Sequence, residues 1–244
     1  MVDSASVSNI AAARALQATS PRHTVTVRLT HWLTVLCFFA LLLSGIEILI
    51  SHPRFYWGEA GNALTAPLFV IPIPASRATV PTGFGYVLPD QNGWSRYLHF
   101  QAAWAVVLTG LWYFLHGLLG RHFQKNLLPS GLRGIGATIK SHLRFHRPSE
   151  DSYNVLQRLA YSGVIFVLFP LTIWTGLAMS PSFTSAFPFT VTAFGGQQSA
   201  RTIHFFCTIT LVLFLFVHVG MVILAGFRSR MRAMLTDRPR KDLT

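Results

Sequence analysis

The sequence carries little charge for its length. Among its 244 residues, 11% are charged and only 8 are acidic, whereas 51% are hydrophobic. Soluble domains usually have about 25% charged residues, so a chain this apolar would expose too much hydrocarbon in water. The composition therefore predicts an integral membrane protein and argues against an ordinary soluble domain.

Cysteine is also scarce, and the motifs that depend on it are absent. Cys37 and Cys207 lie in apolar runs, with no CxxCH for covalent haem and no CxxC pair for metal or redox chemistry. Both are predicted to be small packing residues. The sequence also lacks a nucleotide-binding loop, a hydrolase elbow and paired carboxylates. It has no internal repeat that would support an inverted-repeat transporter.

Long hydrophobic runs are the main feature that the sequence does contain. Four of them reach the length of about 20 residues that spans a hydrocarbon core of about 30 Å as a helix: 29–50, 97–119, 156–179 and 202–227. A helix satisfies its own backbone hydrogen bonds in lipid. The predicted fold class is therefore an all-α integral membrane protein with a four-transmembrane-helix bundle. The third run has no histidine, and we expect it to be scaffold with a kink at Pro170.

The basic residues set the expected orientation. Of the 20 lysines and arginines, three precede the first run, seven lie between the end of the second run and the first turn of the third, and six follow the fourth. The remaining four lie on the other side: Arg54, Arg77, Arg96 and Arg201. By the positive-inside rule, both termini of this multi-pass protein face the cytoplasm. The net charge of +12 is then expected to face the lipid headgroups of the membrane surface. Nucleic acid is not expected as a partner.

The expected organisation has three parts. Residues 1–27 form a cytoplasmic segment without the apolar core of a signal peptide, so the first helix is expected to be an uncleaved anchor. Residues 28–227 form the transmembrane domain, which includes an outer loop at 51–95 and a cytoplasmic interfacial segment at 121–154. Residues 228–244 form a basic cytoplasmic tail.

Two connections are informative. The outer loop is rich in proline and aromatic residues, which argues against disorder; it is expected to be either a docking surface for an outside partner or a lid over the bundle. Within 129–147, a helical stripe is formed by Leu132, Ile135, Ile139 and Leu143. This pattern predicts an interfacial helix on the inner leaflet.

Two histidines lie inside the fourth run. His204 and His218 are 14 positions apart, which is about 40° short of four helical turns with a rise of about 21 Å. Both side chains therefore project from nearly the same face, His204 near the outer end and His218 toward the inner end. Ionisable residues inside a membrane are costly and usually functional. Neutral imidazoles at fixed positions in a dry bundle are suited to axial ligation of haem iron.

Each haem with two histidine ligands needs a second histidine at the same depth. His31 lies near the inner end of the first run, level with His218, and His99 lies near the outer end of the second, level with His204. We therefore expect an inner haem b on His31 and His218 and an outer haem b on His99 and His204. His116 competes for the inner position, but it points about 100° away from the direction of His99. We expect His116 instead to contact a haem propionate or a quinone, or to pack against a neighbouring helix.

This pattern of histidines resembles a known family. It is similar to the di-haem cytochrome b membrane subunits of formate dehydrogenases, nickel–iron hydrogenases and thiosulfate reductases, and to the related bacterial cytochrome b-561 proteins. The resemblance covers roughly residues 24–232. The stretch SHPRFYWGEAG, after the first helix, further resembles the thiosulfate-reductase-type branch.

The resemblance implies a multi-pass protein of the bacterial inner membrane that transfers electrons across it. In the family, a periplasmic redox subunit, such as a molybdopterin oxidoreductase, exchanges electrons with the outer haem, and a quinone is the substrate near the inner one. Two histidines on each iron leave no open coordination position, so oxygen activation at iron is not expected. Propionates need cationic neighbours, and by position Arg96 and Arg201 suit the outer haem and Arg28 the inner one; ordinary snorkelling to the interface is the alternative.

Two other functions stay open. A stand-alone quinone oxidoreductase would act on a small substrate such as superoxide, attracted by the four outer arginines. A haem-free protein would use its membrane histidines as a proton relay in a transporter or sensor. A tightly held catalytic partner would favour the electron-transfer subunit, steady turnover by the lone chain would favour the stand-alone enzyme, and a colourless pure protein would favour the relay.

Overall fold

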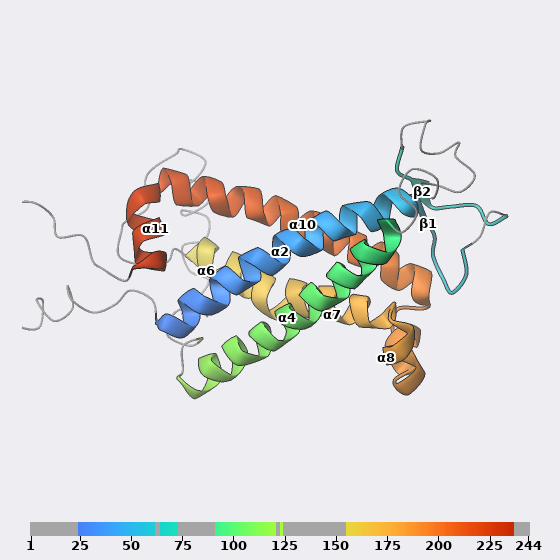
Figure 1. Cartoon of the computed structure of the whole chain (residues 1–244), viewed down its shortest axis with the longest axis horizontal. Coiled ribbons are helices and arrows are strands. Elements are labelled where there is room, and N and C mark those ends of the chain that lie inside the picture. Colours follow the sequence, from blue (N-terminus) through green and yellow to red (C-terminus); the bar gives the residue numbers. More distant parts are fainter. Residues whose placement is uncertain (1–23, 62–63, 73–90, 121–122, 124–154, 237–244) are drawn as a thin grey trace, which may run out of the picture.

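Four membrane-spanning helices lie side by side in the computed structural model, which describes residues 24–61, 64–72, 91–120, 123 and 155–236 (Figure 1). They are α2 (Val25–Ser51), α4 (Gln91–Leu119), an interrupted helix that ends at Ala178, and α10 (Gln197–Leu224). Each is long and apolar enough to cross a bilayer. The predicted four-helix transmembrane fold is therefore confirmed.

The four helices pack as two pairs. α2 contacts α4 extensively, and the last part of the interrupted helix contacts α10. At the centre of the first pair, Cys37, Ala102 and Val106 are buried, with Ala40 and Ala105 packed against them. Small side chains allow helices to approach closely where lipid offers no hydrophobic driving force. Cys37 is thus a packing residue, as its position in the sequence predicted.

The outward surface of the bundle is apolar. Large side chains such as Leu36, Leu43, Leu108 and Phe216 are more than half exposed. A soluble protein rarely presents such a continuous apolar surface to water. Hydrocarbon matches this surface, which explains why so few large side chains need to be buried.

A π-helical turn interrupts the third spanning helix. It runs as α6 (Val155–Gly163), the turn η2 (Val164–Leu168) and α7 (Phe169–Ala178), with the Phe169 N–H donating to the carbonyl of Val164. Pro170 follows at once; it has no N–H, and its ring crowds the carbonyl four residues back. A wider turn relieves that conflict. The distortion expected at Pro170 is present, and it takes the form of this turn just before the proline.

Short elements close one end of the bundle. β1 (Arg54–Phe55) pairs antiparallel with β2 (Phe69–Val70), Arg54 facing Val70, so the outer loop has regular structure that its sequence did not predict. Nearby lie α8 (Pro181–Ala186) and α9 (Phe189–Thr192). α4 begins at Gln91 and α10 at Gln197, so both helices start before the apolar runs at 97 and 202. Their first turns extend beyond the hydrocarbon, where polar residues are acceptable.

The opposite end carries α11 (Phe227–Leu235), which turns away from α10 at Gly226 with φ +97° (Figure 1). The indole N–H of Trp32 donates to the carbonyl of Met234 at 3.2 Å and so fixes α11 to the start of α2. The start of α2 and α11 therefore share one end, which we call the inner end. The interfacial helix predicted within 129–147 lies outside the described residues, as do 1–23 and 237–244. The interfacial helix, the cytoplasmic N-terminal segment and the basic tail therefore stay predictions.

Candidate functional site

Four histidines face one another in two pairs between the helices. The ring centroids of His31 and His218 lie 6.4 Å apart, and those of His99 and His204 lie 6.3 Å apart. His31 is on α2, His99 is on α4, and both of their partners are on α10. The structure thus brings together the same four side chains that the sequence paired by depth. Their role as haem ligands stays a prediction.

The spacing of the rings fits a metal ion held between two imidazoles. A metal–imidazole bond is about 2.0 Å long and the ring centre lies about 1.1 Å further, so two opposed rings on one ion have centres about 6.2 Å apart. Among the described residues, no group of three or more His, Cys, Asp or Glu gathers as a bare metal site would require. Haem supplies four nitrogens itself and needs only two axial ligands. The donor set therefore fits haem better than a bare ion.

The outer imidazole of His99 is held by α2. Its Nδ1 lies 3.0 Å from the hydroxyl of Ser44, a fully buried side chain, and it also hydrogen-bonds to the backbone of Leu41. Gly45 faces the same ring, since a Cβ there would lie 3.5 Å from the Cε1 atom of His99. This edge of the imidazole is therefore fixed, and the other nitrogen is directed away from α2.

The outer imidazole of His204 is held in the same way by α7. Its Nδ1 lies 3.0 Å from the hydroxyl of Thr175 and 3.0 Å from the carbonyl oxygen of Thr172. Thr175 is fully buried, and a Cβ at Gly176 would lie 3.5 Å from the Cε1 atom of His204. The two outer histidines thus share one arrangement: a carbonyl, a hydroxyl three residues later and a glycine after it.

This finding corrects the expectation that the third helix is only scaffold. Thr175 and Gly176 touch a predicted ligand, and Ser44 and Gly45 do the same from the first helix. The third run contains no histidine, so its sequence did not indicate a role at the site. No local signal singles out these residues, because Ser-Gly at 44–45 and Thr-Gly at 175–176 have counterparts in Thr-Gly at 109–110 and Ser-Gly at 162–163.

The inner pair has different surroundings. Aromatic rings pack around it: Trp32 lies 5.3 Å from His31, while Tyr161 and Phe214 lie 5.9 and 5.7 Å from His218. The Nδ1 atoms of His31 and His218 are both buried and have no hydrogen-bond partner among the described residues. Apolar and aromatic contacts therefore hold this pair in place.

His116 does not join either pair. It lies near the inner end of α4, whereas the two pairs join His31 to His218 and His99 to His204. The expected role of His116 outside the ligand set stays a prediction.

Arg201 binds the outer loop. Its guanidinium donates to the carbonyl of Arg54 at 3.0 Å and to the carbonyl of His52, and it lies 4.7 Å above the ring of Phe55. Arginine has five N–H donors, so a propionate could use only those that remain. Its role as a propionate partner stays a prediction.

The other two predicted propionate partners lie at the expected ends. Arg96 is exposed near the outer end, where burial, the charge of Arg201 and the charge of Arg96 together lower the pKa of His52. Arg28 is in the first turn of α2, three residues before His31. Their placement leaves the predicted roles of both residues open.

Segment 52–61 also fixes the start of α10. The carbonyl of Gly58 accepts hydrogen bonds from the N–H groups of Gln198 and Ser199 at 3.0 and 3.3 Å, and the Gly58 N–H donates to the Ser199 hydroxyl at 2.7 Å. The Glu59 carboxylate accepts from the N–H of Gln197 at 3.3 Å. The first turn of a helix has unpaired N–H groups, and here a distant segment pairs them. This segment therefore sets the position of the helix that carries His204 and His218.

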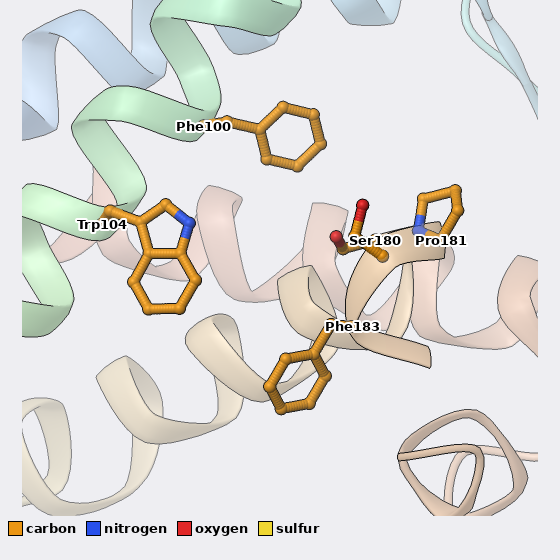
Figure 2. Close-up of a pocket in the computed structure, with 6 residues that line it drawn as sticks. Phe100, Trp104, Ser180, Pro181 and Phe183 are labelled. Carbon is orange, nitrogen blue, oxygen red and sulfur yellow. The ribbon is translucent and has the colours of Figure 1, made fainter. Parts of the chain in front are cut away.

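A cavity of about 380 Å³ lies at the outer end, apart from the paired histidines. In Figure 2, the rings of Phe100 and Trp104 project from α4 toward Phe183 across the space. Ser180, Pro181 and Ser182 complete its lining at the start of α8. None of the four paired histidines lines this cavity.

Comparison with known proteins adds to this geometry. The family model described as prokaryotic cytochrome b561 matches residues 22–237. A protein of Azospira oryzae, provisionally named as the protein-methionine-sulfoxide reductase subunit YedZ1, is 29% identical to this chain over 209 residues. The match covers 83% of this chain and 90% of that protein. No solved structure matches the chain significantly.

Proposed function

This chain belongs to the prokaryotic cytochrome b561 family, and we propose that it is a di-haem b subunit that passes electrons between a periplasmic oxidoreductase and the quinone pool. Family membership and four apolar helices make it a multi-pass electron-transfer subunit of the bacterial inner membrane that binds haem b. The number of haems, the partner and the quinone are the proposed parts.

The observation that carries the proposal is the pair of facing imidazoles at each of two depths. The separations of 6.4 and 6.3 Å suit one metal ion between each pair. Both partners on α10 lie 14 residues apart, which is about 21 Å along the helix. Two haems at these depths would lie toward opposite faces of the membrane.

When bound, haem would supply an iron that accepts and releases single electrons. His31 with His218, and His99 with His204, would hold one haem each and leave no axial position open for oxygen. Ser44 and Thr175 hold the outer imidazoles by their Nδ1 atoms. The surrounding apolar helices would keep water away from both sites.

The proposed partner is a periplasmic redox enzyme, for example one that carries a molybdopterin. The name of the Azospira oryzae relative describes a subunit of a reductase, which supports a partner oxidoreductase for this chain. The proposed membrane substrate is a quinone that reacts near the inner pair. The stand-alone oxidoreductase has less support, because Arg201 already binds two backbone carbonyls of the outer loop.

Haem content of the purified protein tests the proposal directly. Wild-type protein is expected to hold two b haems. His31→Ala or His218→Ala should lose one, and His99→Ala or His204→Ala should lose the other, with different spectra for the two groups. His116→Ala is the matched control and should keep both. Wild-type protein that folds without haem would refute the proposal and favour a proton relay.

The partner is tested separately by purification from the native membrane. An oxidoreductase that copurifies and exchanges electrons with the haems would support a subunit. Steady quinone turnover with superoxide by the lone chain, with no bound partner, would contradict the subunit role and favour the stand-alone enzyme.

A further inference from the structure

The hydrogen bonds at His204 determine which of its nitrogens carries the proton. The carbonyl oxygen of Thr172 lies 3.0 Å from Nδ1, and a carbonyl can only accept. Nδ1 must therefore be the donor. The hydroxyl of Thr175 has one hydrogen, which it donates to the carbonyls of Leu171 at 2.8 Å and Thr172 at 3.0 Å. It is then free to accept from Nδ1 at 3.0 Å.

The same reasoning applies to His99. The Ser44 hydroxyl donates to the carbonyl of Ala40 at 2.7 Å and lies 3.2 Å from that of Leu41, so toward Nδ1 it acts as acceptor. Leu41 adds a second, backbone acceptor. In both outer imidazoles the proton is therefore on Nδ1, and the free lone pair is on Nε2, the nitrogen that would bind a metal.

The inner pair has no such acceptors in the described part of the chain. The Nδ1 atoms of His31 and His218 are buried without a hydrogen-bond partner there. Trp32, Tyr161 and Phe214 surround them instead. Both pairs thus offer imidazole ligands, but the hydrogen bonds behind the two pairs differ.

We propose that Ser44 and Thr175 are positioning residues that make the outer histidines the stronger electron donors, so that the outer haem has the lower midpoint potential. An acceptor on Nδ1–H raises the basicity of the opposite nitrogen, which stabilises ferric iron. Ligand identity, another determinant of the potential, is the same at both sites. A protein carrying one electron would hold it on the inner side. This inference rests on the proposed function, since it requires two haems.

The test is a redox titration of the purified two-haem protein, followed by visible absorption. Two midpoint potentials are expected. The outer one is assigned in the His31→Ala protein, which should keep only the outer haem, and it should match the lower wild-type value. Ser44→Ala and Thr175→Val are each expected to shift the outer potential upward and to leave the inner one unchanged.

Two further variants keep the test informative. Thr175→Ser retains the hydroxyl but is smaller than threonine, and its outer potential should equal that of the wild type. If lost packing caused the shift in Thr175→Val, the outer potential of Thr175→Ser would shift as well. Thr30→Val is the matched control. Thr30 is a buried residue of α2 whose hydroxyl also donates to carbonyls three and four residues back, and among the described residues it bonds to no imidazole. It should leave the outer potential unchanged.

The outcomes separate the inference from the function on which it rests. A protein with one haem or none would overturn both. Two haems with the outer potential above the inner one would overturn only the inference. The same applies if Ser44→Ala and Thr175→Val leave the outer potential where it was while both haems are retained.

Discussion

At the scale of single residues, Gly196 determines how closely the outer loop can approach α10. Its φ is +125°, and an added Cβ would lie 2.3 Å from both the carbonyl carbon and the oxygen of Gly58. Only glycine adopts this backbone region readily. The hydrogen bonds between Gly58 and the start of α10 therefore depend on the absence of a side chain at 196.

Gly196→Ala is expected to destabilise the folded protein by more than about 1 kcal/mol. The alanine would adopt a strained backbone conformation and would also clash with backbone atoms of Gly58. Thermal unfolding in detergent measures the effect. Gly93→Ala is the control, since nothing lies within 4 Å of a Cβ at Gly93 in α4; it should be at least as stable as the wild type, because alanine favours a helix more than glycine does. Equal stability of Gly196→Ala and wild type would contradict the close approach.

At the scale of elements, α10 begins with a cap from outside its own sequence. No side chain at the capping position bonds its first turn; the carbonyl of Gly58 and the carboxylate of Glu59 accept from its N–H groups instead. The Ser199 hydroxyl of α10 in turn accepts from the N–H of Gly58. Thr202 adds a hydrogen bond to the carbonyl of Tyr56 at 2.7 Å. The loop and the helix are therefore expected to unfold together.

Ser199→Ala tests this cap. The change removes the acceptor of the Gly58 N–H, and leaving such a group unpaired costs about 1–3 kcal/mol. Urea or thermal unfolding in micelles should report a loss of this size. Ser185→Ala, which removes a hydroxyl from an exposed residue of α8, should change stability by less than about 0.5 kcal/mol. Similar small effects at both positions would mean that the cap contributes little.

At the scale of the whole molecule, the fold places the two histidine pairs between two helix pairs. Each site combines α10 with a different helix: α2 for the inner pair and α4 for the outer one. The start of α2 and α11 share the inner end (Figure 1). Among the described residues, that end carries the arginines of the first turns of α2 and α6 and those of α11: Arg28, Arg158, Arg228, Arg230 and Arg232. The molecule should therefore have one orientation in the membrane.

Reporter fusions measure this orientation. Green fluorescent protein fused after Thr244 should fluoresce, and alkaline phosphatase at the same place should be inactive, because the positive-inside rule puts this end in the cytoplasm. Alkaline phosphatase inserted after residue 61, in the outer loop, is the control and should be active. The reverse pattern would show that the inner and outer ends are assigned the wrong way round.

The sequence by itself determined the number of spanning helices and the four paired histidines. Hydrophobic length fixes a helix in lipid one segment at a time, and helical periodicity fixes the direction of His204 relative to His218. Neither inference requires knowledge of a neighbouring helix. The turn before Pro170 could also be anticipated, since proline acts on its own local backbone.

Tertiary structure alone decided what supports those histidines and what holds α10 in place. Serine and threonine in apolar helices usually bond their own carbonyls, so Ser44 and Thr175 had no distinctive periodicity. Their contacts cross from α2 to α4 and from α7 to α10. Likewise, Arg201 and the cap of α10 depend on residues about 140 positions away. Such contacts arise from how separate helices pack, which no local pattern in the chain encodes.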